Sequence, residues 1–169
     1  MGALHHIILD TDIGSDVDDA LALALILGSP EARLLGITTV YGDTAPSGYA
    51  WPGRFGKLAG QEIPVHHGLE QPMSGREVWW PGHEGSLHDG LENEPVEEED
   101  AIRYLTSGRS QKRPGEIDVI AIGPLTNIAA ALESDPALRA QRAAPLDHGG
   151  GGFGMDEAEH NFRSDDQAA

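Results

Sequence analysis

The feature that most constrains the fold of this chain is a dense group of aspartates between two apolar segments. Residues 7–9 are apolar and predict the end of a buried strand, while the alanine- and leucine-rich residues 18–27 predict a helix. Five aspartates belong to this short stretch: Asp10, Asp12, Asp16, Asp18 and Asp19. Carboxylates this close repel one another unless a cation or protons lie between them. Oxygen ligands without sulfur favour Ca²⁺ or Mg²⁺, so the stretch predicts a metal site in an enzyme.

The rest of the chain alternates between predicted strands and helices, as in βαβ units. The predicted strands are residues 4–9, 34–40, 63–67 and 117–122; the predicted helices are residues 18–27, 47–59, 97–106 and 125–132, and a last short element covers residues 158–163. Pro52 conflicts with the second helix, and residues 69–95 predict a long functional loop. The fold class is α/β, an open and mainly parallel sheet with flanking helices, in a single domain over residues 1–169.

Ligands of such sheets bind beyond the carboxyl ends of the strands. Four segments are expected at that edge: Asp10–Asp19, Asp43, Gly123–Asn127 and the loop at Gly149. Asp18 and Asp19 are neighbours at a helix start, so their side chains diverge by about 100°. One can face a cation while the other reaches a hydroxyl of the ligand. In the alternative interpretation Asp16 or Asp18 only caps the helix.

Composition narrows the possible partners and the location. A formal net charge of −17 argues against binding to the phosphates of nucleic acids. The chain has no cysteine, which excludes disulfides and sulfur-ligated zinc. The N-terminus has no signal-peptide pattern and no apolar run reaches membrane length. A cytoplasmic protein without a membrane partner is therefore expected.

Four motifs together resemble the nucleoside hydrolases, the inosine–uridine-preferring ribohydrolase family. The segment DTDIGSDVDDALAL (residues 10–23) resembles the N-terminal signature of that family, with Ile13 in place of a proline and two extra residues before Asp18. Three further segments follow in the expected order: ITTVYGD (37–43), IAIGPLTNIA (120–129) and AEHNF (158–162). The resemblance spans essentially the whole chain and implies the Rossmann-like nucleoside hydrolase fold.

The resemblance implies a calcium site and a catalytic base. Asp12 and Asp19 would bind Ca²⁺ through their carboxylates and Thr126 through its main-chain carbonyl, with Mg²⁺ as the less favoured ion. Asp12 would also act as general base on the attacking water. Cleavage of an N-glycosidic bond passes through an oxocarbenium-like sugar, which nearby carboxylates stabilise. The implied reaction is calcium-dependent hydrolysis of a small-molecule ribonucleoside to ribose and free base.

The resemblance also implies a set of substrate-binding residues. Asp18, Glu159 and Asn161 would hydrogen-bond the ribose hydroxyls. Asp43 stands where the family commonly has an asparagine, and His83 where the family often places a histidine of the base pocket.

The length of the chain departs from the family, whose members are usually nearly twice as long. The remaining half would supply a histidine for protonation of the leaving group and an aspartate that completes the calcium shell. A truncated, impaired hydrolase is therefore expected, with exposed apolar surface that favours a homo-oligomer. Two alternatives stay open. One is a non-catalytic remnant that binds ribose or a cation, and the other is a phosphatase of the haloacid dehalogenase type with Asp10 as nucleophile and Asp12 as acid/base.

Overall fold

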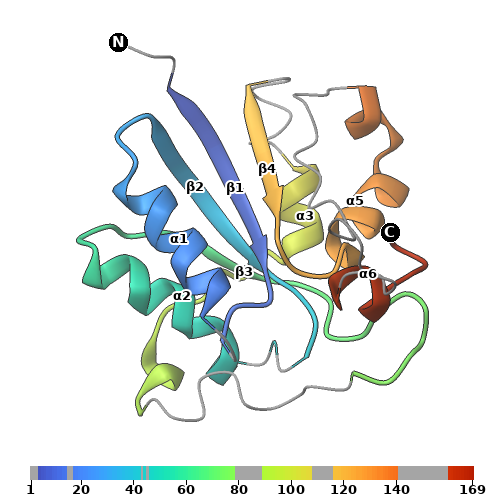
Figure 1. The fold of residues 1–169 in the computed structure, drawn as a ribbon, viewed down its shortest axis with the longest axis horizontal. Helices are drawn as coiled ribbons and strands as arrows, with labels where there is room; N and C mark the ends of the chain where they lie inside the picture. The colour runs from blue at the N-terminus through green and yellow to red at the C-terminus, as the bar shows by residue number, and fades with distance from the viewer. Residues whose placement is uncertain are drawn as a thin grey trace, which may run out of the picture.

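A four-stranded parallel sheet forms the centre of the fold (Figure 1). The computed structural model describes residues 4–14, 17–42, 44, 46–78, 89–107, 116–140 and 160–169. Within these residues the strands are β1 (His5–Thr11), β2 (Ala32–Thr39), β3 (Val65–His67) and β4 (Ile117–Ala121). Their order in the sheet is β3-β2-β1-β4, and each neighbouring pair is parallel. The predicted α/β class with a mainly parallel sheet is confirmed.

Helices cover both faces of the sheet, as Figure 1 shows. The helices are α1 (Asp18–Gly28), α2 (Pro46–Leu58), α3 (Ala101–Thr106), α5 (Thr126–Ser134) and α6 (His160–Ser164), with short 3-10 turns at Leu91–Asn93 and Pro136–Ala140. Alternate residues of β1 point to opposite faces. Ile7 and Leu9 join the cluster under α1 and α2, whereas Ile8 joins the cluster under α3 and α5. Strand β1 is therefore buried on both faces of the sheet.

The burial of β4 and the start of α3 differ from the sequence prediction, and both differences arise from contacts with other parts of the fold. The apolar sequence of residues 117–122 predicts a buried strand, but β4 ends the strand order and its first four residues are half-buried. The helix expected from residue 97 begins only at Ala101, capped by the side chain of Asp100, which accepts from the amide of Arg103 at 2.9 Å. The amide of Glu97 instead donates to the carbonyl of Val65 at 3.0 Å. A backbone hydrogen bond thus ties Glu97 to β3 before the helix starts.

Helix α2 forms although Pro52 lies inside it. A proline there removes one hydrogen bond of the helix and costs roughly 3 kcal/mol in a helix without tertiary support. Here Trp51 and Phe55 pack edge to face, with ring centroids 6.2 Å apart, and both rings pack against the core cluster under α1. This burial of aromatic surface offsets the lost hydrogen bond.

An exposed apolar stripe runs along α1. Val17, Leu21 and Leu25 follow one another at a spacing of four residues and have exposed fractions of 72%, 66% and 71%. The stripe agrees with the exposed apolar surface expected from the sequence, while the homo-oligomer stays a prediction. In the part of the chain that the structure describes, no helix is both long enough and apolar enough to cross a membrane.

Candidate active site

The topology places a switch point of the sheet at the carboxyl end of β1. The chain leaves β1 toward β2 and β3 on one side, and β4 then adds to the other side of β1. The strand order reverses between β1 and β4, and ligands of open α/β sheets bind at such a point. The amide of Ile122, just after β4, donates to the carbonyl of Asp10 at 2.9 Å. The aspartate-rich turn and the segment at residues 123–127 are therefore neighbours, as predicted.

Asp10 is a buried carboxylate near the carboxyl end of β1. Its side chain is fully buried, and Oδ1 accepts from Thr38 Oγ1 at 2.5 Å and from Asn127 Nδ2 at 2.8 Å. Burial raises the pKa of Asp10 to about 7, the two hydrogen bonds oppose this shift, and the charge of Asp19 adds to it. Complete burial leaves Asp10 no access to a phosphate ester, so the structure does not support its role as a phosphatase nucleophile.

Asp12 lies against the backbone of Gly123. A Cβ atom at residue 123 would be 3.1 Å from Asp12 Oδ1, 3.0 Å from the Asp12 amide nitrogen and 2.7 Å from a methyl group of Val40. Only a residue without a side chain can pack this closely against Asp12 and Val40. The half-buried Asp12 carboxylate thus sits at the junction of two segments that the sequence placed in one site.

Asp18 and Asp19 diverge at the start of α1 as predicted. Asp18 is exposed, whereas Asp19 is buried and accepts a short hydrogen bond from the hydroxyl of Thr11. The N-cap of the helix is Val17, without a capping side chain, so Asp18 does not cap it. Asp16, the other candidate cap, lies outside the described residues. The helix N-terminus favours negative charge on both aspartates.

Thr126 is the first residue of α5 and is buried at the same edge. Its hydroxyl donates to Oδ2 of Asp165 at 2.6 Å. Asp165 is fully buried and accepts in addition from the amides of Met73, Ser74 and Ala168 at 2.7, 3.1 and 3.3 Å. Burial alone would raise the pKa of Asp165, but these four hydrogen bonds outweigh burial and hold it below its ordinary value.

Of the predicted substrate-binding residues beyond α1, Asn161 is described by the structure. Asn161 Nδ2 donates to the carbonyl of Ile122 at 2.5 Å, which brings α6 to the carboxyl end of β4 (Figure 1). Asp43, His83 and Glu159 lie outside the described residues, so their roles stay predictions. Sequence reasoning gave no role in the site to Asn127 or Asp165. Asn127 lay inside a quoted motif, and none of the quoted motifs contained Asp165.

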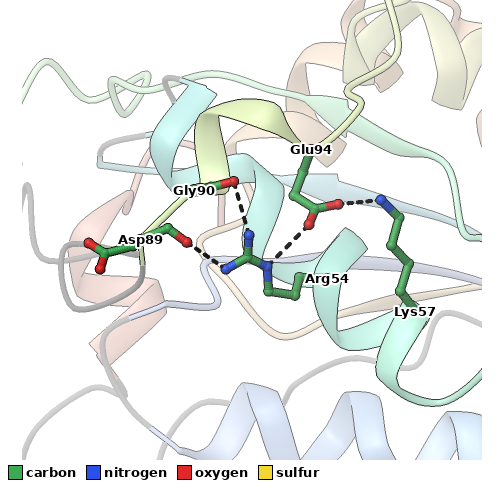
Figure 2. A network of polar contacts seen from close by, with 5 residues as sticks. All are labelled: Arg54, Lys57, Asp89, Gly90 and Glu94. Atoms are coloured by element: carbon green, nitrogen blue, oxygen red, sulfur yellow. Dashed lines mark hydrogen bonds and ion pairs between the residues drawn. The ribbon is translucent and has the colours of Figure 1, made fainter.

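A polar cluster fixes the far end of the loop that follows β3 (Figure 2). Arg54 on α2 donates to Glu94 at 3.1 Å and to the carbonyls of Asp89 and Gly90 at 2.9 Å each. Lys57 donates to the other oxygen of Glu94, and hydrogen bonds from Lys57 and then Arg54 lower the pKa of that carboxyl. These contacts fix residues 89–94, which follow the segment that contains His83 in the sequence.

The residues at the carboxyl end of β1 fit a hard cation in their chemistry. Asp12, Asp19 and the carbonyl of Thr126 offer oxygen donors only, which is the ligand type that hard cations prefer. The donors to Asp10 and Asp19 named above are neutral hydroxyl and amide groups. Among the described residues, no three Asp, Glu or His side chains form a metal cluster. A cation here would therefore need further oxygen ligands beside these, because Ca²⁺ takes six to eight.

A parallel α/β fold with a carboxylate-lined switch point defines the general class of this protein, and comparison with known proteins identifies its family. Residues 7–169 match the inosine-uridine preferring nucleoside hydrolases, and the chain belongs to that family. It is 30% identical to a probable uridine nucleosidase of Oryza sativa subsp. japonica over 178 residues, covering 96% of this chain and 53% of that protein.

Solved structures agree with this assignment. The plant nucleoside hydrolase PpNRh1 superposes with a TM-score of 0.81 at 30% identity, over 97% of this chain and 55% of that one. A purine-preferring ribonucleoside hydrolase from Gardnerella vaginalis gives a TM-score of 0.77 at 29% identity, over 97% and 56% of the two chains. The chain thus spans about half the length of the relatives it matches.

Proposed function

We propose that this protein takes part in the metal-dependent hydrolysis of the N-glycosidic bond of ribonucleosides. The observation that carries the proposal is that Asp12, Asp19, Thr126 and Asn161 belong to segments beyond the carboxyl ends of the neighbouring strands β1 and β4. Membership of the nucleoside hydrolase family supports it. The proposed substrate is a small ribonucleoside, and the products are ribose and the free base.

Asp12 is the proposed general base. Its carboxylate takes a proton from a water molecule, whose oxygen then bonds to C1′ of the ribose. The C1′–N bond breaks as this bond forms, and the base leaves with the electron pair and takes up a proton. Asp12 and Asp19 place negative charge near the sugar, which stabilises the positive charge that develops on it.

The proposed cation is Ca²⁺, with Mg²⁺ less favoured, held by the carboxylates of Asp12 and Asp19 and the carbonyl of Thr126. When bound, it would lower the pKa of a nearby water and stabilise developing charge. Asp18 and Asn161 are the proposed ribose contacts among the described residues, supported by their places at the ends of α1 and β4. Asp43, Glu159 and His83 complete the proposed substrate site from the family resemblance.

Base preference is left to experiment, because the relatives differ in it. The rice protein is named as a uridine nucleosidase and the Gardnerella enzyme as purine-preferring. A direct test incubates the protein with uridine, cytidine, inosine and adenosine and measures free ribose and free base. We expect release with Ca²⁺ and none with a chelator. Cleavage of p-nitrophenyl phosphate without nucleoside cleavage would contradict the proposal.

Ribose or cation binding without turnover is the second candidate function, supported by the oxygen donors of Asp12 and Asp19 at the carboxyl end of β1. If the second half of the relatives supplies the residue that protonates the leaving base, these 169 residues alone would bind better than they turn over. Calorimetric titration with Ca²⁺ and then ribose separates the two candidates. Binding of both without release of base from any nucleoside would favour the second.

A further inference from the structure

We propose that Asp165 is a positioning residue for the cation site, acting through Thr126. The inference rests on the proposed function, in which the main-chain carbonyl of Thr126 is a ligand of the cation. Asp165 would not touch the cation or the substrate. It would fix the residue that does.

The carboxylate of Asp165 joins three segments that are distant in the sequence. Oδ2 accepts from the hydroxyl of Thr126 at the start of α5 and from the amide of Met73 in the loop after β3. Oδ1 accepts from the amide of Ser74 in the same loop and from the amide of Ala168 in the turn after α6. Because Asp165 is fully buried, water does not compete for these hydrogen bonds.

The first turn of α5 depends on side-chain contacts for its position. The N-cap, Leu125, has no capping side-chain hydrogen bond. The two residues that follow are anchored in different directions instead. Thr126 bonds to Asp165 in the C-terminal turn, while Asn127 bonds to Asp10 on β1 and to the carbonyl of Thr39 on β2. Loss of the first anchor would free the Thr126 side of the turn, where the proposed ligand lies.

Both oxygens of Asp165 accept hydrogen bonds, Oδ2 from Thr126 and Met73 and Oδ1 from Ser74 and Ala168. Asparagine has the same shape but turns one acceptor into a donor. An Asp165→Asn variant would therefore face a hydroxyl or amide donor with an amide donor, and one hydrogen bond at least would break.

The experiment measures cation binding, with no turnover required. Ca²⁺ affinity is determined by calorimetry for the parent protein, Asp165→Asn and Thr126→Val, the last of which removes the hydroxyl and keeps the carbonyl. The luminescence lifetime of bound Tb³⁺ in H₂O and D₂O then reports how many waters the ion retains. Asp166→Asn is the matched control, since Asp166 is the next residue, is exposed and pairs with Arg76 at the surface.

We expect Asp165→Asn and Thr126→Val each to weaken Ca²⁺ binding by about tenfold or more, and each to add a coordinated water to Tb³⁺. The double variant should lose no more than either single one, and Asp166→Asn should match the parent. A general loss of stability would not by itself add a water to the bound ion.

Parent-like Ca²⁺ affinity and Tb³⁺ hydration in a folded Asp165→Asn protein would overturn the inference. If that variant does not fold, Thr126→Val decides in the same way, and a parent-like result overturns it. Failure of the parent itself to bind either ion is a different result. It would refute the proposed cation site, and the inference with it.

Discussion

Asn127 Nδ2 donates to Oδ1 of Asp10 at 2.8 Å, although 117 positions separate the two residues in the chain. The same nitrogen donates to the carbonyl of Thr39 at 2.9 Å, and Asn127 Oδ1 accepts from the amide of Leu69 at 2.9 Å. One buried amide thus joins the ends of β1 and β2 to the loop after β3. Gly68 allows this approach, because a Cβ there would lie 2.3 Å from the amide of Asn127.

Asn127→Ala should lower the free energy of unfolding by about 3 kcal/mol. The substitution removes one of the two hydrogen bonds to Asp10 Oδ1 and those to the Thr39 carbonyl and from the Leu69 amide, and a buried group left unsatisfied costs about 1–3 kcal/mol. Urea denaturation measures the change. Gln61→Ala, which removes an exposed amide, is the control and should stay within about 0.5 kcal/mol of the parent. Equal stability of the two variants would refute this role for Asn127.

Asp10 should make the protein less stable as the pH rises from about 4 to about 7 in the presence of a chelator. Its pKa is about 7 in the folded state and 3.8 as a model value, so the folded protein binds more protons in this range. The contribution of one such group is at most about 1.4 kcal/mol per pH unit. Urea midpoints across this range should fall less steeply for Asp10→Asn, which keeps the acceptor for Thr38. The same slope in parent and variant would contradict the raised pKa.

Gly123→Ala should lower kcat/KM for nucleoside cleavage by about 100-fold. The new Cβ would lie 3.0 Å from the Asp12 amide and 3.1 Å from its carboxylate, and a small displacement of a catalytic group has effects of this size. Gly28→Ala is the matched control, because no atom lies within 4 Å of a Cβ there. If both variants turn over nucleosides at the parent rate, the proposed role of Asp12 beside Gly123 is contradicted.

Arg54→Met should loosen the end of the loop that leads to η1, the 3-10 turn at Leu91–Asn93. The substitution removes the hydrogen bonds to Glu94 and to the carbonyls of Asp89 and Gly90 (Figure 2). Hydrogen exchange should become severalfold faster at the amides of Asn93 and Glu94. Lys57→Met removes only the exposed contact to Glu94 and should have the smaller effect. Unchanged exchange in Arg54→Met would show that other contacts hold the loop.

Local sequence patterns predicted much of the fold correctly. An apolar run cut off by aspartates predicted β1, and acids at the start of an alanine- and leucine-rich run predicted α1. The burial of β4 could not be predicted this way, because it depends on the place of the strand at the end of the sheet order. The predicted start of α3 was wrong because it, too, depends on a contact distant in the sequence. The amide of Glu97 donates to the carbonyl of Val65 in β3, and no local pattern reveals this hydrogen bond.

In the candidate site, too, local patterns predicted some features, while contacts between distant residues determine others. The divergence of Asp18 and Asp19 follows from helix geometry, so their sequence positions predicted it. The roles of Asn127 and Asp165 depend on contacts across 117 and 39 residues, and periodicity carries no information at such separations. The family resemblance placed Asp12 and Thr126 in one site, and the structure adds the glycine and the carboxylate that surround them.

The rate of ribose release by Asp12→Asn tests the central claim most directly. Purified parent, Asp12→Asn and Asp166→Asn are compared on the best nucleoside substrate with Ca²⁺ present, after circular dichroism has shown that all three are folded. We predict that Asp12→Asn lowers kcat by about 1,000-fold, since a positioned general base contributes roughly 10²–10⁴-fold, and that Asp166→Asn keeps the parent rate. Parent-like turnover by Asp12→Asn would contradict the account.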